Sequence, residues 1–500
     1  MTDLATTAPS APPAAGGDLR LLPPAPRVAG HAGVAGHAAP TAGTVPAGAD
    51  PRDPAIRIGQ LVGGPWTVLA DADGVLVGEG LVDDVPTVIF ATDPRRSGGA
   101  LGEQGCAAIA DAYDAAVATG RPVVGIWHSG GARLTEGVAS LAAVGRVFAA
   151  MTMASGKVAQ VSLVLGPAAG GAAYGPALTD VVVMGPAGRV FVTGPDIVRS
   201  VTGEDVDMER LGGPEPHGRA SGVAHVVTQT DAEAILQTRR LIGLLAGPTH
   251  PRIVVDRPLA ELLPERPARA YDVKPLLARL LDEEPLELHP RWAPNLVTAL
   301  GRLGGRPVGV LANNPMRLGG CLDATSGDKG ARFVRLCDAL GLPLVVVVDV
   351  PGYLPGAGQE WGGVVRRGAK LLHAFAACRV PRVTLVTRKA YGGAYIALNS
   401  RSLGATRVLA WPGAHVDVMG AVAAVRLLHR RALADLEPAE RADEELRLAA
   451  EHVVTSGGLQ RALASGAVDE IIEPDRTRTA LAVAIAAAPY GRGDHGNIPL

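Results

Sequence analysis

The sequence predicts an α/β protein made of two copies of one unit, and three observations lead to this prediction. Short β-rich runs alternate with stretches of helix-forming composition, this series of runs occurs twice, and glycine pairs follow corresponding runs in both series. Alternating strands and helices are typical of βαβ units with a parallel sheet. A chain of 500 residues, 47% of them apolar, also exceeds what one hydrophobic core usually supports.

Each series contains three short β-rich runs that are apolar and rich in valine. Between the first two runs of the first series lies a stretch of helix-forming composition, residues 103–118. Runs of this length and composition predict buried strands of a parallel sheet. The predicted strands are residues 86–92, 122–127 and 158–165 in the first series and 307–313, 343–348 and 380–387 in the second.

The spacing between matching residues indicates that the second series is a duplicate of the first. Matching glycines are 221 positions apart near the first predicted strand (98 to 319) and 222 apart after the third (170 to 392). Matching prolines further on are 226 apart (186 to 412). Because the spacing changes so little over about a hundred residues, we interpret the chain as an internal repeat.

The repeat predicts the domain organisation. Residues 1–56 are dominated by alanine, proline and glycine, with few large apolar side chains to offset the entropy of ordering them, and are predicted to be disordered. The two α/β domains are predicted to span residues 57–260 and 261–500. A connector rich in proline and arginine (247–269) and a short helix (273–281) are expected around the boundary.

A glycine pair follows the third predicted strand of each half, Gly170-Gly171 in the first and Gly392-Gly393 in the second. Glycine lets the backbone turn sharply and lets a ligand approach the main chain, while the start of the next helix presents unpaired N–H groups. Such a turn can stabilise the oxyanion of an enolate or a thioester. The glycines could instead serve only tight packing, but their recurrence in both halves favours function.

A second glycine-rich turn, Ser129-Gly130-Gly131-Ala132-Arg133, follows the second predicted strand, and its counterpart in the second half is residues 349–356. Both turns come at the carboxyl ends of strands, where α/β sheets bind ligands. Arg133 is a candidate for binding a phosphate or carboxylate. A surface ion pair is the alternative for this side chain, and the sequence leaves both open.

Composition and missing motifs argue against several classes of function. A formal charge of −2 without blocks of like charge disfavours binding to nucleic acid or to a membrane surface. Four widely spaced cysteines and scattered histidines predict neither a metal site nor a disulfide framework. The phosphate-loop, GxSxG and HExxH patterns are absent, as is the Met-Lys-Met segment that carries biotin. Apolar runs too short for a bilayer and the lack of a signal-peptide pattern predict a cytoplasmic protein.

Several motifs in a constant order give the chain a specific resemblance to one family. It resembles the carboxyltransferase (β) subunits of biotin-dependent acyl-CoA carboxylases, which include acetyl-CoA and propionyl-CoA carboxylases, over residues 57–490. The motifs are Gly98-Gly-Ala-Leu-Gly-Glu103, Ser129-Gly-Gly-Ala-Arg133, Phe191-Val-Thr-Gly-Pro195, Val201-Thr-Gly-Glu-Asp205, Asp349-Val-Pro-Gly352, Gly362-Gly-Val-Val-Arg-Arg-Gly-Ala-Lys370 and Thr387-Arg-Lys-Ala-Tyr-Gly-Gly-Ala-Tyr395.

The resemblance implies two duplicated crotonase-like (ClpP/crotonase) domains and a set of site residues. Gly170 and Gly171 would form the oxyanion hole for the thioester enolate, and Gly393 and Ala394 would hold the carbonyl oxygen of carboxybiotin. The remaining expected contacts are Ser129, Gly130, Gly131, Ala132, Arg133 and Ile396 for acyl-CoA, and Gly352, Tyr353, Gly392 and Tyr395 for carboxybiotin.

The resemblance also implies the reaction and the partners. The family moves CO₂ from carboxybiotin to the α carbon of a short acyl-CoA, and the freed ureido nitrogen takes the α-proton, so that neither a side-chain base nor a metal is needed. Biotin would arrive on a separate carrier, because the chain lacks a biotinylated lysine segment and an ATP-grasp region. The expected partners are acyl-CoA, a biotin carboxylase/biotin carboxyl carrier subunit and further copies of this chain, with the active site at a dimer interface, commonly within a hexamer.

The sequence departs from the family pattern at three places. An Ala/Pro-rich stretch before residue 55 replaces the family's basic leading helical region, and His128 stands where the family usually has Asp. Ile396 occupies a position associated with acyl-chain selection, and an apolar residue there favours acetyl-CoA over propionyl-CoA.

Two other functions remain open on the sequence. A biotin-dependent decarboxylase or transcarboxylase subunit would use the same enolate chemistry, and a non-catalytic assembly paralogue would keep only the oligomer-forming surfaces. An enoyl-CoA hydratase or isomerase is disfavoured, because such enzymes use one unit and need carboxylate acid–base residues.

Overall fold

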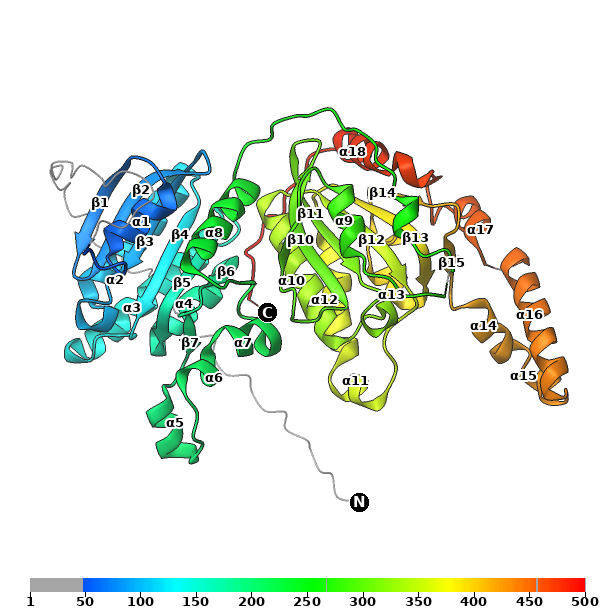
Figure 1. Cartoon of the computed structure of the whole chain (residues 1–500), viewed down its shortest axis with the longest axis horizontal. Coiled ribbons are helices and arrows are strands. Elements are labelled where there is room, and N and C mark those ends of the chain that lie inside the picture. Colours follow the sequence, from blue (N-terminus) through cyan, green and yellow to red (C-terminus); the bar gives the residue numbers. More distant parts are fainter. Residues whose placement is uncertain (1–47, 267, 456, 500) are drawn as a thin grey trace, which may run out of the picture. The chain divides into compact units, whose positions relative to one another are not determined.

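The computed structural model describes residues 48–499 except 267 and 456, and within these residues it contains two eight-stranded sheets of the same topology (Figure 1). The first sheet has the order β1-β2-β3-β4-β5-β6-β8, with β7 paired to the end of β5. Its strands are β1 (Trp66–Ala72), β2 (Val75–Val82), β3 (Val85–Thr92), β4 (Val123–Ser129), β5 (Gln160–Ala169), β6 (Val181–Met184), β7 (Arg189–Phe191) and β8 (Val226–Val227).

The second sheet repeats this arrangement, in the order β9-β10-β11-β12-β13-β14-β16 with β15 paired to the end of β13. In both sheets an antiparallel hairpin leads into strands that run parallel to one another. The strands are β9 (Leu286–Leu288), β10 (Leu296–Leu303), β11 (Arg306–Asn313), β12 (Leu344–Val350), β13 (Arg382–Tyr391), β14 (Arg407–Ala410), β15 (His415–Asp417) and β16 (Glu470–Ile471).

Helices connect the parallel strands and cover the faces of the sheets. Those of the first half are α1 (Pro54–Val62), α2 (Glu103–Thr119), α3 (Val138–Ala154), α4 (Tyr174–Leu178), α5 (Pro195–Thr202), α6 (Met208–Gly212), α7 (Pro214–Pro216) and α8 (Asp231–Leu245). Those of the second half are α9 (Lys274–Leu280), α10 (Ala324–Leu340), α11 (Ala357–Trp361), α12 (Val364–Ala377), α13 (Gly392–Ala397), α14 (Ala421–Leu428), α15 (Arg430–Ala434), α16 (Pro438–Thr455), α17 (Leu459–Ala464) and α18 (Thr477–Ala487).

The six predicted strands are confirmed, as β3, β4, β5, β11, β12 and β13. The duplication is confirmed as well, and the structure explains why the spacing between matching residues grows. The first residue paired to β5 from β6 is Val181, and its counterpart paired to β13 from β14 is Arg407, 226 positions later. The extra residues lie between α13 and β14, in a segment that contains a short 3₁₀ turn, Arg401–Leu403.

The prediction of disorder for residues 1–56 needs a correction at its end. Residues 1–47 lie outside the described part of the chain, but α1 begins at Pro54, inside the predicted segment. The Asp53 side chain caps this helix by accepting from the Ala55 N–H at 2.8 Å, and Pro54 occupies the first turn, where a proline costs no hydrogen bond. The Asp-Pro pair is therefore a helix start that the composition argument overlooked.

Two equivalent helices of the two halves, α2 and α10, show how the local sequence sets the length and the end of a helix. Both have 17 residues and both end at a glycine in the left-handed conformation, Gly120 (φ 67°) and Gly341 (φ 75°). At its start, α10 carries a capping box between Asp323 and Ser326, whereas the first N–H of α2, that of Glu103, donates to the distant Glu136 carboxylate at 2.7 Å. The two helices therefore have the same length and the same terminating glycine although their first residues differ.

The hydrophobic core joins the two halves. One buried cluster contains residues of both halves, among them Ile89 and Val124 from the first sheet and Leu311 and Val346 from the second. The outer faces form separate clusters, one beneath α2 and α3 and one beneath α9 and α18. Because each sheet is covered on both faces, its parallel strands are almost uniformly apolar, as the sequence pattern indicated.

Two histidines meet where the halves adjoin. The rings of His225 and His289 are 4.1 Å apart between centroids, and the His289 N–H donates to the His225 carbonyl at 2.7 Å. Burial lowers the pKa of His225 to about 3 and holds that of His289 well below its usual value. Both rings are therefore neutral in the folded protein near neutral pH.

Within the described residues, no helix combines the length and the apolar composition that crossing a membrane requires.

Candidate active site

The first glycine pair begins a helix directly at the end of β5. Ala169 is the last residue of the strand, Gly170 has a φ of 57°, and a 3₁₀ turn starts at Gly170 and continues into α4. No side chain caps this turn, so the N–H groups at its start have no side-chain acceptor. The φ of Gly170 lies in the left-handed region, where other residues are strained, which explains a glycine at this position.

The turn 129–133 lies directly against this glycine pair. A Cβ atom on Gly131 would be 2.7 Å from the Ala169 carbonyl oxygen and 3.6 Å from the Gly171 nitrogen. The turn also receives support from the preceding loop, because the Gly130 N–H donates to the Gly98 carbonyl at 3.0 Å. The first half therefore brings together the residues that the sequence predicted for the first oxyanion hole and for acyl-CoA, except Ile396, which lies in α13 of the second half.

Arg133 ties its own turn to the neighbouring chain. Its guanidinium pairs with Asp73 and, at 2.9 Å, with Glu136, and it also donates to the Ala100 carbonyl at 3.1 Å. The hydrogen bond to Asp73 is the main reason that the pKa of Arg133 is raised. Of the two roles left open by the sequence, the structure displays the ion pair, with the side chain 16% exposed.

The second glycine pair repeats the geometry of the first. Gly392 has a φ of 58°, α13 starts at this residue, and no side chain caps the helix. Gly393 is exposed, with no other atom within 4 Å of a Cβ placed on it, and Ala394 is buried. The second half thus presents an open main-chain surface at the start of a helix.

Of the other predicted carboxybiotin residues, Gly352 and Tyr353 follow β12, and Tyr395 lies in α13. Residues 352–353 are tied to the loop before α10, since the Leu322 N–H donates to the Gly352 carbonyl at 3.1 Å. The Tyr395 side chain is buried and its hydroxyl donates to the Ala467 carbonyl at 3.0 Å, so it supports the fold behind the turn. Ile396 is 45% exposed at the front of α13.

A buried ion pair that the sequence did not reveal lies at the end of β12. The Arg388 Nε donates to Asp349 Oδ2 at 2.7 Å, and the guanidinium carbon is 4.7 Å from the centre of the Tyr271 ring. Asp349 also accepts from the Lys389 N–H at 3.2 Å. This pair joins the ends of two neighbouring strands, β12 and β13. A signal was available, because Asp349 stands 221 positions after His128, the residue that departs from the family pattern.

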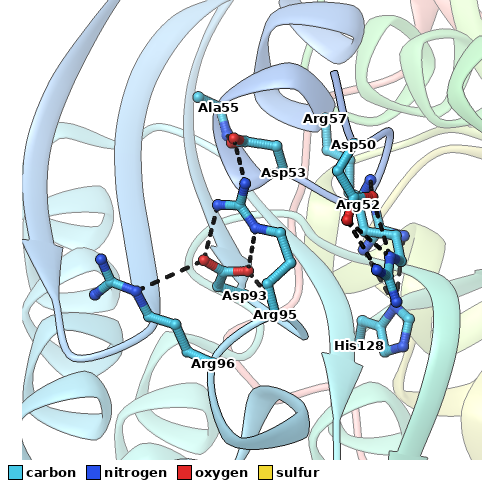
Figure 2. Close-up of polar contacts among 9 residues, drawn as sticks. All are labelled: Asp50, Arg52, Asp53, Ala55, Arg57, Asp93, Arg95, Arg96 and His128. Carbon is cyan, nitrogen blue, oxygen red and sulfur yellow. Dashed lines mark hydrogen bonds and ion pairs between the residues drawn. The ribbon is translucent and has the colours of Figure 1, made fainter. Parts of the chain in front are cut away.

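The first half has His128 at the place of Asp349. Its Nδ1 is 3.5 Å from both terminal nitrogens of Arg57, which belongs to α1 (Figure 2). Its backbone N–H donates to Thr92 Oγ1 at 2.8 Å. Burial, followed by the charge of Arg57, lowers the pKa of His128 to about 4. The ring is therefore neutral at neutral pH and accepts through Nδ1.

Beside His128, a network of arginines and aspartates fastens the start of α1 to the loop after β3. Arg95 donates to Asp53 at 2.6 Å and to Asp93 at 2.8 Å, and Arg96 lies 3.9 Å from Asp93 (Figure 2). Burial alone would raise the pKa of Asp93, but the hydrogen bonds from Arg95 outweigh it and the pKa is lowered. Sequence reasoning missed this network because its members are up to 43 positions apart.

Within one chain, the glycine-rich turns predicted for acyl-CoA and for carboxybiotin remain separate, and only Ile396, predicted for acyl-CoA, lies beside the carboxybiotin residues in α13. Among the described residues, no hydrogen bond joins the turns of the first half to those of the second. No group of three or more His, Cys, Asp or Glu side chains in the described part of the chain could hold a metal ion.

Comparison with known proteins assigns the family. A model of the carboxyl transferase domain matches residues 66–492. The chain belongs to the carboxyl transferase family. It is therefore an enzyme of the transferase/ligase type, and the resemblance to carboxyltransferase β subunits is confirmed.

Two similar proteins carry names of acyl-CoA carboxylase subunits. The chain is 59% identical over 464 residues to the biotin-dependent acetyl-/propionyl-coenzyme A carboxylase beta6 subunit of Mycobacterium tuberculosis, covering 90% of this chain and 97% of that protein. It is 53% identical over 463 residues to the propionyl-CoA carboxylase beta chain of Rhodococcus erythropolis, with coverage of 90% and 97%.

Among solved structures, the carboxyl transferase described here is similar to transcarboxylase 12S, with a TM-score of 0.80 and 38% identity, covering 86% of this chain and 85% of that one. That structure is a hexamer with methylmalonyl-coenzyme A and methylmalonic acid bound. The prediction of two crotonase-like domains is thereby confirmed.

Proposed function

We propose that this carboxyl transferase is the carboxyltransferase component of a biotin-dependent acyl-CoA carboxylase, and that it prefers acetyl-CoA to propionyl-CoA. The observation that carries the proposal is the pair of equivalent glycine turns, with φ values of 57° at Gly170 and 58° at Gly392, each opening an uncapped helix. Two turns of this kind suit a reaction with two carbonyl oxygens to stabilise, the thioester of an acyl-CoA and the ureido carbonyl of biotin.

In this proposal the first half, residues 57–260, binds acyl-CoA. The N–H groups of Gly170 and Gly171 stabilise the thioester oxygen as it becomes an enolate, and each such donor contributes a few kcal/mol, roughly 3–4, to a transition state of this type. The backbone of residues 129–133 lines the CoA site. Arg133 acts through its main chain, because its guanidinium is bound to Asp73 and Glu136.

The second half, residues 261–500, receives biotin. Gly393 and Ala394 hold the ureido carbonyl, and Gly352, Tyr353, Gly392 and Tyr395 shape the surrounding surface. The open space in front of Gly393 fits such a group, since nothing lies within 4 Å of a Cβ built there. Carboxybiotin, when bound, supplies CO₂ and a ureido nitrogen that accepts the α-proton, so the chain's own task is to bind, orient and stabilise charge.

The assignment of acyl-CoA to the first half and biotin to the second indicates which partner proteins the chain needs. The chain requires a biotin carboxylase/biotin carboxyl carrier subunit, because its sequence has no ATP-binding motif and no biotinylated lysine segment. The separation of the two residue sets within one chain supports an active site shared between neighbouring copies in a dimer. The hexameric state of the similar transcarboxylase 12S supports a hexamer.

The preference for acetyl-CoA rests on Ile396. This branched apolar side chain is 45% exposed three residues after Gly393, on the helix whose start holds the ureido carbonyl in this proposal. Its bulk at the acyl end of the substrate disfavours the additional methyl group of propionyl-CoA.

The experiment is acyl-CoA-dependent carboxylation by the purified chain together with a biotinylated carboxylase partner, ATP and bicarbonate. Acetyl-CoA, propionyl-CoA and longer acyl-CoAs are compared by kcat/KM, and acetyl-CoA is expected to be the best substrate. A higher kcat/KM for propionyl-CoA refutes the preference. Absence of product with every acyl-CoA, with a partner proven active on another carboxyltransferase, refutes the carboxylase.

The similarity to transcarboxylase 12S favours one second candidate, a subunit that transfers CO₂ between two acyl compounds through biotin. Adding a carboxylated acyl-CoA in place of ATP and bicarbonate separates the two. Transfer to biotin under those conditions, without any ATP-dependent carboxylation, would favour the transcarboxylase.

A further inference from the structure

The ends of β4 and β12 are held by different chemistry, although the strands are equivalent. In the second half a buried Asp349–Arg388 ion pair joins β12 to β13 at 2.7 Å. In the first half position 128 is histidine, and position 166, which corresponds to Arg388, is glycine. The first half therefore lacks both members of the pair.

At the end of β4, an arginine from helix α1 contacts the residue that replaces the aspartate. Arg57 projects from α1 and approaches His128 Nδ1 with both terminal nitrogens at 3.5 Å (Figure 2). Gly166 makes room for this arrangement, because a Cβ on it would overlap with the His128 ring. The contact that holds the end of β4 is thus formed by Arg57 and His128, in the space that Gly166 leaves.

Arg57 depends on His128, because its guanidinium has no carboxylate of its own. The other arginines in Figure 2 pair with aspartates, Arg52 with Asp50 at 2.8 Å and Arg95 with Asp53 and Asp93. Arg57 is 3% exposed, and among the described residues its side chain hydrogen-bonds to His128 alone. A buried cation with one neutral acceptor is costly to leave unpaired.

The main chain of His128 connects this contact to the turn 129–133. Its N–H is bound to Thr92 Oγ1, its carbonyl lies against Gly99, and the next residue, Ser129, accepts from the Gly131 N–H at 3.2 Å. Movement of the His128 ring would therefore displace the residues proposed to line the CoA site.

We propose that His128 is a positioning residue for acyl-CoA: its neutral ring holds Arg57 of α1, and this contact keeps the turn 129–133 in its binding conformation. The proposal rests on the proposed function, because it assigns acyl-CoA to this turn. It also gives α1 a role in the site, in a chain whose leading region departs from the family pattern.

The charges around His128 make the contact sensitive to protonation. Arg57 faces the ring from α1, Asp50 and Arg52 face it from the preceding segment, and Asp231 at the start of α8 acts on Arg57. A proton on Nδ1 removes the acceptor and places a second cation beside Arg57. The KM for acyl-CoA is therefore expected to rise as the pH falls from 6.5 toward 4, with a smaller change in kcat.

The test compares His128→Ala with His128→Asn, whose Oδ1 can replace Nδ1 as acceptor. His128→Ala is expected to raise the KM for acetyl-CoA by on the order of tenfold or more, since small displacements of positioning groups have effects of this size. His128→Asn is expected to stay within about threefold of the parent protein, within the spread of a retained hydrogen bond. The acid rise in KM should disappear in His128→Asn, and the control His250→Asn, at an exposed histidine in the connector, should keep it.

Equal KM values for the Ala and Asn variants, or an acid rise that persists in His128→Asn, would overturn the proposal. Thermal unfolding of the whole chain between pH 4.5 and 6.5 provides a readout that does not require activity. His128→Asn should lose less of its melting temperature on acidification than the parent, and identical losses would refute the contact itself. Failure of the parent to bind acetyl-CoA would instead refute the proposed function.

Discussion

The two halves of the molecule share a backbone but differ in the side chains that hold it. Gly170 and Gly392 have φ values of 57° and 58°, and the pairing of β4 with β5 and of β12 with β13 shifts register at equivalent places near the strand ends. Behind these turns, the second half has a buried ion pair at 2.7 Å and the first half a neutral histidine 3.5 Å from an arginine of α1. The main-chain geometry of the two glycine turns has thus been kept, while its support has diverged.

This difference teaches that the two turns depend on different parts of the chain. The Asp349–Arg388 pair lies within the second sheet, between neighbouring strands, whereas the first-half turn depends on a helix that precedes the sheet. The second half is therefore self-supporting at this point, and the first half is sensitive to its leading segment. Four predictions test the comparison.

Breaking the ion pair of the second half has the largest expected effect. Asp349→Ala leaves Arg388 buried without a carboxylate and should cost about 3–5 kcal/mol of unfolding free energy. His128→Ala should cost less, about 1–2 kcal/mol, because Arg57 loses a long contact to a neutral ring rather than a carboxylate partner. Chemical denaturation measures both, with Asp114→Ala, at an exposed position of α2, as the control near zero. Equal losses of unfolding free energy in His128→Ala and Asp349→Ala would contradict the proposed difference between the two halves.

Adding a side chain to either of the two glycine turns should strongly lower turnover. Gly171→Val and Gly393→Val are each expected to lower kcat by about 10²- to 10³-fold, the usual effect of losing one oxyanion donor. Gly413→Val is the matched control for Gly393→Val, since neither glycine has another atom within 4 Å of an added Cβ. Acetyl-CoA binding, measured by calorimetry, should persist in Gly393→Val. If Gly393→Val keeps full turnover, the second turn is only structural.

Acid should destabilise the protein through histidines that are neutral in the fold. The pKa values of His128 and His225 are lowered to about 4 and about 3, and that of His289 lies well below 6.5. Below pH 6.5 the unfolded chain binds protons at these histidines that the folded chain does not bind. The contribution of the neutral histidines to the free energy of unfolding is therefore complete above pH 6.5. It is lost as the pH falls, by up to about 1.4 kcal/mol per pH unit for each histidine.

Denaturation at pH 7 and pH 5 checks this expectation, and His225→Asn and His128→Asn should each reduce the pH dependence. The two reductions should be similar over this range, because both folded-state pKa values lie below 5. An unchanged slope in both variants would contradict the assignment.

Ile396 should show the smallest effect, a change in substrate choice. Ile396→Ala is expected to raise the kcat/KM ratio of propionyl-CoA to acetyl-CoA by about tenfold, because one methyl group in an apolar site is worth about 1–3 kcal/mol. The control is Leu427→Ala, at an exposed leucine of α14. If the ratio moves as much in the control, Ile396 does not face the acyl group.

Much of the fold was predictable because it depends on local pattern. Apolar runs predicted β3, β4, β5 and their counterparts, and the spacing of glycines predicted the repeat. Helix α1 was within reach too, since Asp53-Pro54 is a recognisable helix start, but the Ala/Pro-rich composition before it obscured the signal. The glycine turns were predicted as well, because a left-handed φ at a strand end selects glycine by its own stereochemistry.

The supporting side chains were not predictable in the same way. Arg57 meets His128 across 71 positions, Arg133 meets Asp73 across 60, and Arg388 meets Asp349 across 39. The sequence indicated Arg133 as a candidate ligand for a phosphate, and only the structure places its guanidinium on two carboxylates.

By itself, the sequence determined the α/β class, the duplication and the position of the two glycine turns. Each of these follows from periodicity and backbone conformation over a few residues. The tertiary structure decided which charges meet and which remain unpaired, and thus that the first turn rests on α1 and the second on its own sheet. The physical reason is that hydrogen bonds and ion pairs form only within a few ångströms, and distances between residues far apart in sequence are set by the packing of whole sheets and helices.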